Sequence, residues 1–224
     1  HKGMAFYVRN NLLSPVDKFL KNIFDYMTAL LLILLFSPLL ILLYSIVYFS
    51  TNGHPLFKHR RIGLNGKKFN VYKFRTMYID ADKRLEELLE EDEEIRIEWE
   101  NDFKLKNDPR ITKVGNFLRR TSLDELPQLI NVLQGKMSLI GPRPIVDQEI
   151  AKYGEYFDYF TAVKPGITGL AQINGCRGEV ETEKDIVNRV KFDIFYLENW
   201  SVLLDLKIIY KTVFNAIKGE EKAY

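Results

Sequence analysis

Residues 26–50 read YMTALLLILLFSPLLILLYSIVYFS, a stretch that contains no charged side chain. As a helix, this stretch would extend roughly 37 Å at 1.5 Å per residue, which is long enough to cross a bilayer. A soluble core helix is rarely apolar on every face over this length. The stretch is too long for a signal peptide, and no small-residue cleavage site follows it. We therefore expect these residues to insert into a membrane.

Basic residues flank this stretch on both sides: Lys18 and Lys21 lie before it, and Lys58, Arg60 and Arg61 lie after it. Positive residues mark the cytoplasmic side of a membrane segment, and here they mark both ends. Ser37-Pro38 lies near the middle, where proline removes a helix hydrogen bond and clashes with the preceding turn, so a kink is expected. Two topologies remain open: a re-entrant helix that bends at Ser37-Pro38 and returns to its entry face, or a spanning helix that tolerates its proline.

The whole chain has 224 residues and a net charge of +2, a length that suits one domain or two small ones. Residues 80–102 carry 12 acidic and 3 basic side chains, so the rest of the chain is basic. We expect this acidic segment to be a solvated helix, with Leu85, Leu88 and Leu89 on one face. The single cysteine, Cys176, excludes an internal disulfide and a cysteine-based zinc site, and it fits a reducing compartment.

Residues 56–77 have the pattern of a β-hairpin, with Asn65-Gly66 in the turn between two strand-like runs. Seven Lys and Arg side chains and no acidic one lie between residues 58 and 79. Beside a membrane-inserted helix, such a patch attracts anionic headgroups or phosphate substrates. A solvated, charged strand is the alternative interpretation, and the membrane stretch argues against nucleic acid as the partner.

A second apolar pattern at helical spacing lies near the end of the chain, with lysines between its members. The apolar positions are Leu203, Leu206, Ile209 or Tyr210, Val213 or Phe214, and Ile217. One interpretation is an amphipathic helix packed on the protein core. The other is a basic amphipathic helix that lies on the membrane surface, and the pattern alone does not choose between them.

The side chains best suited to chemistry lie in residues 117–144, which read FLRRTSLDELPQLINVLQGKMSLIGPRP. Pro127 is tolerated only in the first turn of a helix, which predicts a helix that begins near Leu123-Asp124 and ends at Gly135. The predicted buried face of this helix consists of Leu126, Leu129, Ile130 and Leu133.

This prediction places Asp124 and Glu125 at a helix N-terminus, where the dipole favours ionised carboxylates, with Arg119 and Arg120 just before them. An ionised aspartate can attack phosphorus, an adjacent glutamate can bind Mg²⁺, and arginine matches the geometry of phosphate. The alternative is a plain capping arrangement that carries no chemistry.

Two rigid turns follow, at residues 141–144 (Gly-Pro-Arg-Pro) and 164–169, and the first presents another guanidinium. Turns of this kind usually have only a structural role. The chain contains no GxxxxGK(S/T) P-loop and no GxGxxG element. Their absence argues against a P-loop NTPase or a Rossmann nucleotide site.

Six motifs occur in a fixed order: FSP (36–38), YKFRTM (72–77), RRTSLDELPQLINVL (119–133), MSLIGPRP (137–144), KPGITGLAQING (164–175) and VKFDIFYLENWSVLLDLKII (190–209). Together they resemble the bacterial sugar transferase family, the monotopic polyprenyl-phosphate phosphoglycosyltransferases. The likeness covers nearly the whole chain from about residue 18. It implies an enzyme that transfers a sugar 1-phosphate from a UDP-sugar to undecaprenyl phosphate and releases UMP. Such a reaction starts the assembly of an exopolysaccharide, an O-antigen or an S-layer glycan.

The resemblance also implies roles for individual residues. Asp124 matches the nucleophile that forms a covalent phosphosugar intermediate, and Glu125 matches its partner, which holds Mg²⁺. Arg119 matches an arginine that contacts phosphate. Substrate binding is implied for the turn formed by Pro142, Arg143 and Pro144, and contact with the polyprenyl phosphate for Lys73 and Arg75.

The fold implied is a mixed α/β (α+β) one, rich in helices, with a small β-hairpin or sheet and surface amphipathic helices. Its parts are a lead-in segment (1–22), a re-entrant membrane helix (23–52) that breaks at the Ser-Pro pair, and a cytoplasmic catalytic domain (53–224). The enzyme would work at the cytoplasmic face of the bacterial inner membrane, in contact with membrane lipid and without nucleic acid.

Two features distinguish this chain from small members of the family. Cys176 interrupts their Asn-Gly-Arg motif, which leaves the role of Arg177 open. The acidic segment and the Ala223-Tyr224 ending resemble larger members, which favours galactose or glucose as the sugar and is compatible with a homodimer. The chain starts with His-Lys-Gly-Met, so we expect it to be the catalytic part of a longer protein.

Two other classes of function remain open on the residues alone. A membrane-anchored adaptor without activity would use the basic patch to bind lipid or a partner protein. A hydrolase acting on lipid phosphates or nucleotide sugars would use the same carboxylates as the transferase.

Overall fold

The computed structural model of the chain describes residues 12, 14–102, 105, 107–176 and 183–218. The chain divides into two compact units. The first unit is drawn from residues 1–35, 58–72 and 128–224, and the second from residues 36–57 and 73–127. Helices dominate both units and the strands are short, in agreement with the helix-rich mixed fold that the sequence predicted.

The apolar stretch forms one long helix, α1 (Pro15–Thr51), of 37 residues. Only 11% of its most apolar 18-residue window is buried within the protein, so α1 does not behave as the core helix of a soluble domain. Its length and composition suffice to cross a membrane. The helix continues through Pro38, and the division between the two units falls between Leu35 and Phe36, just before that proline. The bend and the re-entrant path predicted there stay predictions.

The basic hairpin is confirmed: β1 (Leu56–Ile62) and β2 (Lys68–Phe74) form a two-stranded sheet. The connection contains a short 3-10 turn, η2 (Leu64–Gly66), in which Asn65 and Gly66 have positive φ angles of 54° and 71°. Asparagine and glycine tolerate this left-handed region better than other residues, which explains the Asn-Gly signal.

A second pair of strands, which the sequence pattern did not reveal, lies in the first unit. β3 (Ser138–Ile140) pairs in parallel with β4 (Gly166–Thr168). The predicted turn at residues 164–169 therefore contains the strand β4. Glycine is required at position 166, because a Cβ there would collide with the backbone of Gly141.

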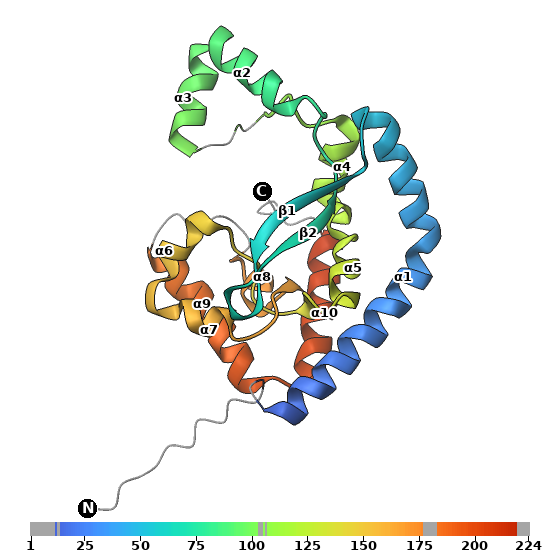
Figure 1. Ribbon diagram of the computed structural model, residues 1–224, viewed down its shortest axis with the longest axis vertical. Coiled ribbons are helices and arrows are strands. Elements are labelled where there is room, and N and C mark those ends of the chain that lie inside the picture. Colours follow the sequence, from blue (N-terminus) through green and yellow to red (C-terminus); the bar gives the residue numbers. More distant parts are fainter. Residues whose placement is uncertain (1–11, 13, 103–104, 106, 177–182, 219–224) are drawn as a thin grey trace, which may run out of the picture. The chain divides into compact units, whose positions relative to one another are not determined.

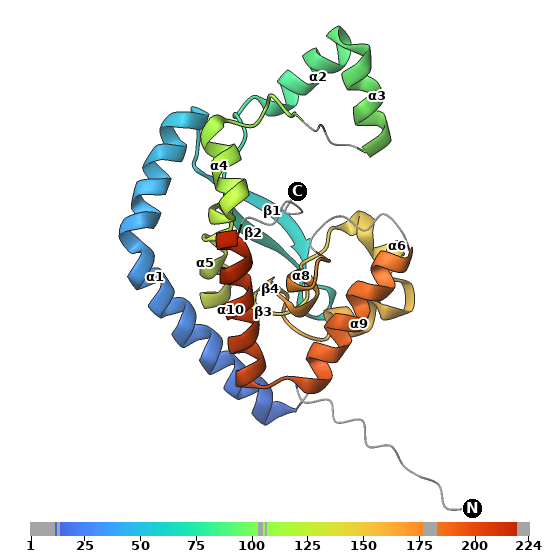
Figure 2. The same cartoon turned by 180° about the vertical axis from the view of Figure 1, so that it is seen from behind.

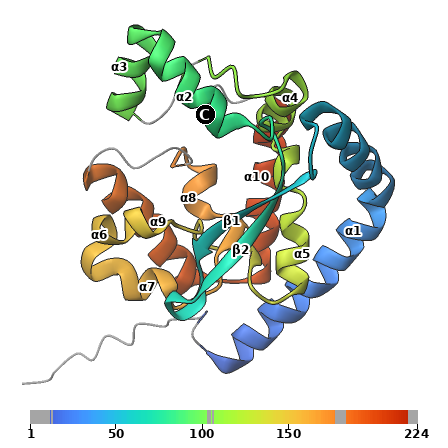
Figure 3. The same cartoon turned by 45° about the horizontal axis from the view of Figure 1, so that its top comes forward.

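Helices surround this parallel pair in the first unit. Figure 2 shows α10 (Val202–Lys218) beside β3 and β4, and Figure 3 shows α6 (Ile150–Tyr153), α7 (Phe157–Thr161) and α9 (Glu183–Asn199) grouped together. The remaining elements of this unit are α5 (Gln128–Leu133), η4 (Asp147–Glu149), η5 (Gly154–Tyr156) and α8 (Leu170–Ile173). The main core of the unit joins Ala29 of α1 to apolar side chains from α5, β3, α9 and α10.

Helix α5 buries a different face from the one predicted. Leu129 and Val132 are buried, whereas Ile130 and Leu133 are 41% and 39% exposed. The buried face also includes the polar side chain of Asn131, which is fully covered.

Asn131 makes hydrogen bonds along the edge of β2. Its Oδ1 accepts a hydrogen bond from the Tyr72 N–H at 2.9 Å, and its Nδ2 donates to the Asn70 carbonyl oxygen at 2.8 Å. A polar side chain thus pairs with backbone groups that a neighbouring strand would otherwise satisfy.

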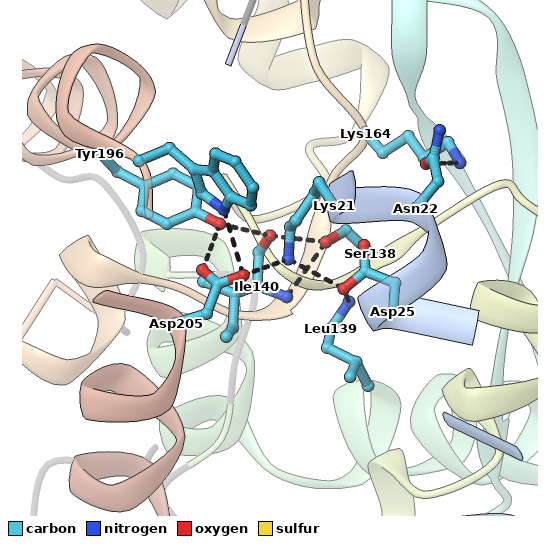
Figure 4. Close-up of polar contacts among 10 residues, drawn as sticks. Lys21, Asn22, Asp25, Ser138, Leu139, Ile140, Lys164, Tyr196 and Asp205 are labelled. Atoms are coloured by element: carbon cyan, nitrogen blue, oxygen red, sulfur yellow. Dashed lines mark hydrogen bonds and ion pairs between the residues drawn. The ribbon is translucent and has the colours of Figure 1, made fainter. Parts of the chain in front are cut away.

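A buried group of charges holds the start of α1 within the first unit (Figure 4). The ammonium of Lys21 donates to Asp25 Oδ1 at 2.8 Å and to Asp205 Oδ2 at 2.7 Å, and none of these three residues is more than 5% exposed. Two further hydrogen bonds reach Asp205, from Tyr196 and Trp200. Lys21 is therefore an internal ion-pair partner and not a basic flank of the membrane stretch, whereas Lys18 is exposed.

Most of the apolar stripe of α10 faces outward, and of its described members only Ile209 packs on the core. Five of its described members, Leu203, Leu206, Tyr210, Val213 and Phe214, are each at least 49% exposed, whereas Ile209 is partly buried. The helix packs through another face, which includes Asp205 and Ile208. The side chain of Ile217, the last predicted member of the stripe, lies outside the described part of the chain.

The acidic segment belongs to the second unit and forms two helices, α2 (Ala81–Glu91) and α3 (Glu93–Asp102), instead of the single predicted helix (Figure 1). Asp92 separates them, because its backbone is extended and its carboxylate accepts hydrogen bonds from the N–H groups of Glu94 and Ile95. An aspartate that caps the next helix in this way ends the preceding one. No described side chain of α2 is buried, in agreement with a solvated segment.

We expect Asn131→Ala to destabilise the first unit, because it leaves the Tyr72 N–H and the Asn70 carbonyl without their side-chain partner. Each polar group left unpaired costs up to about 1–3 kcal/mol. Thermal unfolding of the detergent-solubilised chain should therefore show a melting temperature several degrees below that of the parent. The control is Asn116→Ala, which alters an exposed asparagine of the second unit. Equal melting temperatures for the two variants would contradict the role of Asn131.

Candidate active site

The Asp124–Glu125 pair lies on a short 3-10 turn, η3 (Leu123–Glu125), in the second unit. Helix α4 (Lys113–Thr121) precedes this turn and is followed by Ser122, whose φ of 55° lies in the left-handed region. Helix α5 begins only at Gln128, so the pair does not occupy the first turn of an α-helix. The predicted helix start near Leu123-Asp124 is therefore wrong, and the helix dipole does not explain the ionisation of these carboxylates.

Leucines on either side of the pair hold the turn against the second half of α1. Leu123 and Leu126 pack on a cluster that contains Leu43 and Val47 of α1. The other buried members of this cluster come from β2 and α4: Phe74 and Leu118. Apolar contacts before and after the two carboxylates therefore place them beside the apolar helix.

Asp124 is 5% exposed, and its Oδ1 atom has no hydrogen-bond partner among the described residues. Burial raises the pKa of its carboxyl to about 6, and the neighbouring charge of Glu125 adds to the rise. The positive charges of Lys73 and Arg119 act in the opposite direction. At neutral pH the group is therefore mostly ionised, yet more basic than an ordinary aspartate, which suits a nucleophile.

Lys73, near the end of β2, contacts both carboxylates. Its Nζ donates to Glu125 Oε1 at 2.7 Å and lies 3.8 Å from Asp124 Oδ2. The side chains of Lys73 and Glu125 are each 31% exposed, so both can reach a ligand that approaches from solvent. The basic motif after the hairpin thus supplies one cation to the acidic pair.

Thr76 orients Arg119, which lies in the last turn of α4. Arg119 Nε donates to Thr76 Oγ1 at 3.0 Å. Thr76 itself is 8% exposed, and its carbonyl accepts a hydrogen bond from the Thr112 N–H at 3.0 Å. Gly115 approaches the same carbonyl so closely that a Cβ would collide with it. Thr76 and Gly115 are positioning residues that sequence reasoning missed, although Thr76 lies within the YKFRTM motif.

The structure does not bring Arg75 to the acidic pair. Arg75 Nε donates to the His54 carbonyl oxygen at 2.9 Å, and its guanidinium lies 5.8 Å from the centre of the Phe57 ring. Within the described part of the chain, no ion pair joins Arg75 to Asp124 or Glu125. Its predicted contact with a lipid phosphate stays a prediction.

The predicted substrate-binding turn, Pro142-Arg143-Pro144, lies in the first unit directly after β3. The Gly141 N–H donates to the Thr168 carbonyl at 2.9 Å, and the Pro142 carbonyl accepts a hydrogen bond from the Gly166 N–H at 2.8 Å. Contacts with β4 therefore fix the start of the turn, while Arg143 is partly exposed. Its role in substrate binding stays a prediction.

The acidic pair fits Mg²⁺ by the chemistry of its oxygens. Among the described residues, no group of three or more His, Cys, Asp or Glu side chains is placed to hold a metal ion. Mg²⁺ does not require such a cage, because it keeps several waters and binds through one or two carboxylates together with substrate phosphates. The partner-free Oδ1 of Asp124 and the partly exposed carboxylate of Glu125 can supply such oxygens.

The chain is similar to known proteins over nearly its whole length. A model of the family described as "Bacterial sugar transferase" matches residues 16–219. The "Undecaprenyl-phosphate galactose phosphotransferase" of Salmonella typhimurium is 47% identical over 213 residues, which are 95% of this chain and 43% of that protein. The "UDP-glucose:undecaprenyl-phosphate glucose-1-phosphate transferase" of Escherichia coli is 44% identical over 205 residues, 90% of this chain and 41% of that protein.

A shorter relative matches over most of its own length. The "Exopolysaccharide production protein ExoY" of Sinorhizobium fredii is 41% identical over 211 residues, which are 93% of this chain and 91% of that protein. The chain therefore spans less than half the length of the Salmonella and Escherichia relatives but most of the length of this one.

We expect the Asp124 carboxyl to be half-ionised at about pH 6, above its ordinary value of 3.8, because burial disfavours the charged form. Carboxyl ¹³C shifts of labelled aspartate, with the Asp124 signal assigned by Asp124→Asn, measure this midpoint. Glu125→Gln should move the midpoint to lower pH by removing a negative neighbour. Lys73→Gln should move it to higher pH by removing a positive one. A midpoint near 3.8 in the parent would show that burial does not control this group.

Proposed function

The chain belongs to the bacterial sugar transferase family, and we propose that it transfers a sugar 1-phosphate from a UDP-sugar to undecaprenyl phosphate with release of UMP. The observation that carries the proposal is the buried, partner-free Oδ1 of Asp124, with the charges of Lys73 and Arg119 acting on it. Relatives named for galactose and glucose support a UDP-hexose donor of one of these two kinds. A relative named for exopolysaccharide production supports glycan assembly as the pathway that the product enters.

The proposed reaction has two displacements at one phosphorus atom. In the first, ionised Asp124 attacks the phosphorus that carries the sugar, the phosphoanhydride bond breaks, and UMP leaves with the bonding electrons. In the second, an oxygen of undecaprenyl phosphate attacks the same phosphorus and the bond to Asp124 breaks, which restores the carboxylate. Lys73 and Arg119 supply positive charge where phosphate oxygens must approach a carboxylate, and Thr76 fixes the direction of Arg119.

Glu125 is the proposed ligand of Mg²⁺ in this reaction. When bound, the ion would neutralise charge on the diphosphate of the donor. Glu125 Oε1 accepts a hydrogen bond from Lys73 Nζ at 2.7 Å, which fixes the orientation of the carboxylate that would hold the ion.

The proposed location of the enzyme is the cytoplasmic face of the inner membrane, with α1 as a re-entrant helix. The first unit contains both the start of α1 and the hairpin segment 58–72 that follows this helix. Leu64 of the hairpin turn lines the same cavity as Lys18 and Lys21 at the start of α1. Segments before and after the apolar stretch therefore share one compact unit, which supports a path that returns to its entry face.

Helix α10 is the second proposed membrane contact. Its outward apolar stripe lies next to the exposed lysines Lys207 and Lys211. An exposed apolar stripe with basic neighbours is typical of helices that lie at the level of lipid headgroups. This supports the membrane-surface interpretation of the C-terminal pattern.

We expect Asp124→Asn to abolish the covalent intermediate, because a neutral amide is a poor nucleophile. The parent, incubated with a UDP-hexose and Mg²⁺ but without acceptor, should gain the mass of a hexose phosphate in an intact-protein mass spectrum. The variant should show no such gain, and its rate of UMP release should fall at least about a thousandfold. Asp82→Asn, the same change at an exposed aspartate of the second unit, is the control and should behave like the parent. An adduct on the Asp124→Asn protein would disprove the nucleophile assignment.

The same assay separates the competing functions when it is run with and without undecaprenyl phosphate. Continuous UMP release that requires the acceptor supports the transferase. Release that proceeds equally without acceptor indicates a hydrolase, and no release with any UDP-sugar indicates an adaptor. A panel of UDP-sugars identifies the donor.

The re-entrant path predicts that residues on both sides of α1 lie in the cytoplasm. Single cysteines at Lys18→Cys and Lys58→Cys, in a Cys176→Ser background, should both be protected from a membrane-impermeant maleimide in intact spheroplasts and labelled in inverted vesicles. Replacement of Ser37-Pro38 by Ala-Ala permits a straight apolar helix that is long enough to span, so part of the population should then label on opposite faces. Labelling on opposite faces in the parent would overturn the re-entrant path.

A further inference from the structure

A cavity of about 130 Å³ opens beside the start of α1 in the first unit. Most of its lining is apolar, from residues that include Leu12, Leu64 and Val163. A water molecule occupies roughly 30 Å³ of liquid, so the cavity has room for a group of several heavy atoms. The acidic pair of the candidate active site belongs to the second unit, so this cavity is a separate feature.

The polar part of the lining contains the ammonium group of Lys164, which the charge of Asp25 stabilises from a distance but which forms no ion pair in the described part of the chain. Lys164 is partly buried; its Nζ donates to the neutral side-chain oxygen of Asn22 at 2.7 Å and lies 5.4 Å from the centre of the Tyr26 ring. Among the described residues, no carboxylate forms an ion pair with Lys164, whereas the neighbouring Lys21 has two. Figure 4 shows the Lys164–Asn22 pair next to the Lys21 group. Burial lowers the pKa of Lys164, so an anion beside it would restore stability to its charged form.

The lining also contains a hydrogen-bond acceptor that lacks a donor. Asp25 is 3% exposed and lines the cavity, and its Oδ2 has no partner in the described part of the chain. Its Oδ1 is used by Lys21 and, at 3.3 Å, by the Leu139 N–H. A ligand complementary to this cavity would therefore carry a negatively charged group that binds Lys164 and a hydroxyl group that donates to Asp25.

The position of the cavity indicates where such a ligand comes from. The outer face of α1 next to it carries exposed apolar side chains, among them Phe19, Leu20 and Ile23. The exposed Lys18 lines the cavity as well, which adds positive charge to that of Lys164. Exposed apolar side chains with lysines at one end are typical of a protein surface at the level of lipid headgroups.

We propose that this cavity binds the phosphodiester headgroup of an anionic, hydroxyl-bearing phospholipid such as phosphatidylglycerol. Lys164 and Lys18 bind the phosphate oxygens, and a headgroup hydroxyl donates to Asp25 Oδ2. The bound lipid holds the start of α1 at the membrane surface. The proposal rests on the membrane placement of α1 but not on the transfer reaction.

The test is native mass spectrometry of the full chain in detergent, titrated with lipids that carry identical acyl chains. We expect half-occupancy by phosphatidylglycerol at a concentration about tenfold below that of phosphatidylcholine. This ratio corresponds to the free energy that one charge-assisted hydrogen bond contributes. Phosphatidylmethanol, which has the same charge but no headgroup hydroxyl, should bind several-fold more weakly than phosphatidylglycerol. Equal binding of these two anionic lipids would overturn the role of Asp25.

Three lysine variants distinguish binding in the cavity from a general effect of surface charge. Lys164→Gln keeps a donor for Asn22 but removes the charge, and it should weaken phosphatidylglycerol binding about tenfold, while Lys164→Arg should recover most of it. Lys207→Gln removes an exposed lysine of α10 and is the control, with an expected change below about twofold. Equal losses in Lys164→Gln and Lys207→Gln, at unchanged melting temperatures, would overturn the proposal.

A soluble phosphate ester is the alternative ligand that could bind to the same lysines. Glycerol 3-phosphate at millimolar concentration should not displace the lipid, and displacement would assign the cavity to a soluble ligand instead. Asp124→Asn should bind phosphatidylglycerol as the parent does while it loses transfer. Failure of the catalytic proposal and failure of the lipid proposal therefore give different results.

Discussion

The packing of two leucines on the second half of α1 is the constraint on which the candidate active site depends. Leu123 and Leu126 stand on either side of the Asp124–Glu125 pair and contact a cluster that includes Leu43 and Val47 of the apolar helix. Because the turn between them is short, the carboxylates cannot move away from the helix without breaking these contacts. Burial against this apolar cluster raises the pKa of Asp124, and Lys73 and Arg119 keep the group ionised at neutral pH. One packing arrangement thus sets both the place and the basicity of the Asp124 carboxylate, which is the proposed nucleophile, next to the apolar helix.

The first half of α1 is held in a different way, by charge. Lys21 bridges Asp25 and Asp205 in the interior of the first unit, and Tyr196 and Trp200 satisfy the remaining acceptors of Asp205. A buried ion pair stabilises a fold only weakly, but removal of one partner leaves a buried charge uncompensated, which costs several kcal/mol. Through Lys21 and Asp205, this group joins the start of α1 to α10. Lys164 lies beside it with a neutral hydrogen-bond partner, and this difference between two neighbouring lysines is the basis for proposing an anion site in the adjacent cavity.

Much of the local structure follows from sequence patterns. The apolar stretch, the basic hairpin with its Asn-Gly turn and the solvated acidic segment are each specified by neighbouring residues, because length, charge and turn chemistry act over short distances. The start of the helix near Pro127 was predicted wrongly because the prediction used only neighbouring residues. A proline in a first turn is compatible with several helix starts, and only the left-handed Ser122 and the packing of Leu123 and Leu126 separate the 3-10 turn from α5. The stripe on α10 has helical spacing, but spacing does not tell which face meets the protein.

By itself, the sequence determined that the chain has a long apolar helix, a basic hairpin and an acidic pair at residues 124 and 125, and its ordered motifs determined the family. Only the tertiary structure decided that Lys73 pairs with Glu125, that Thr76 orients Arg119, that Lys21 is buried and that most of the apolar stripe of α10 faces outward. The physical reason is that burial and charge pairing are properties of groups brought together from distant positions: Lys73 and Glu125 are 52 residues apart, and Lys21 and Asp205 are 184 apart. A sequence pattern indicates which secondary structure each segment can form. The pKa of a carboxyl and the partner of a lysine depend instead on the groups that the fold places around them.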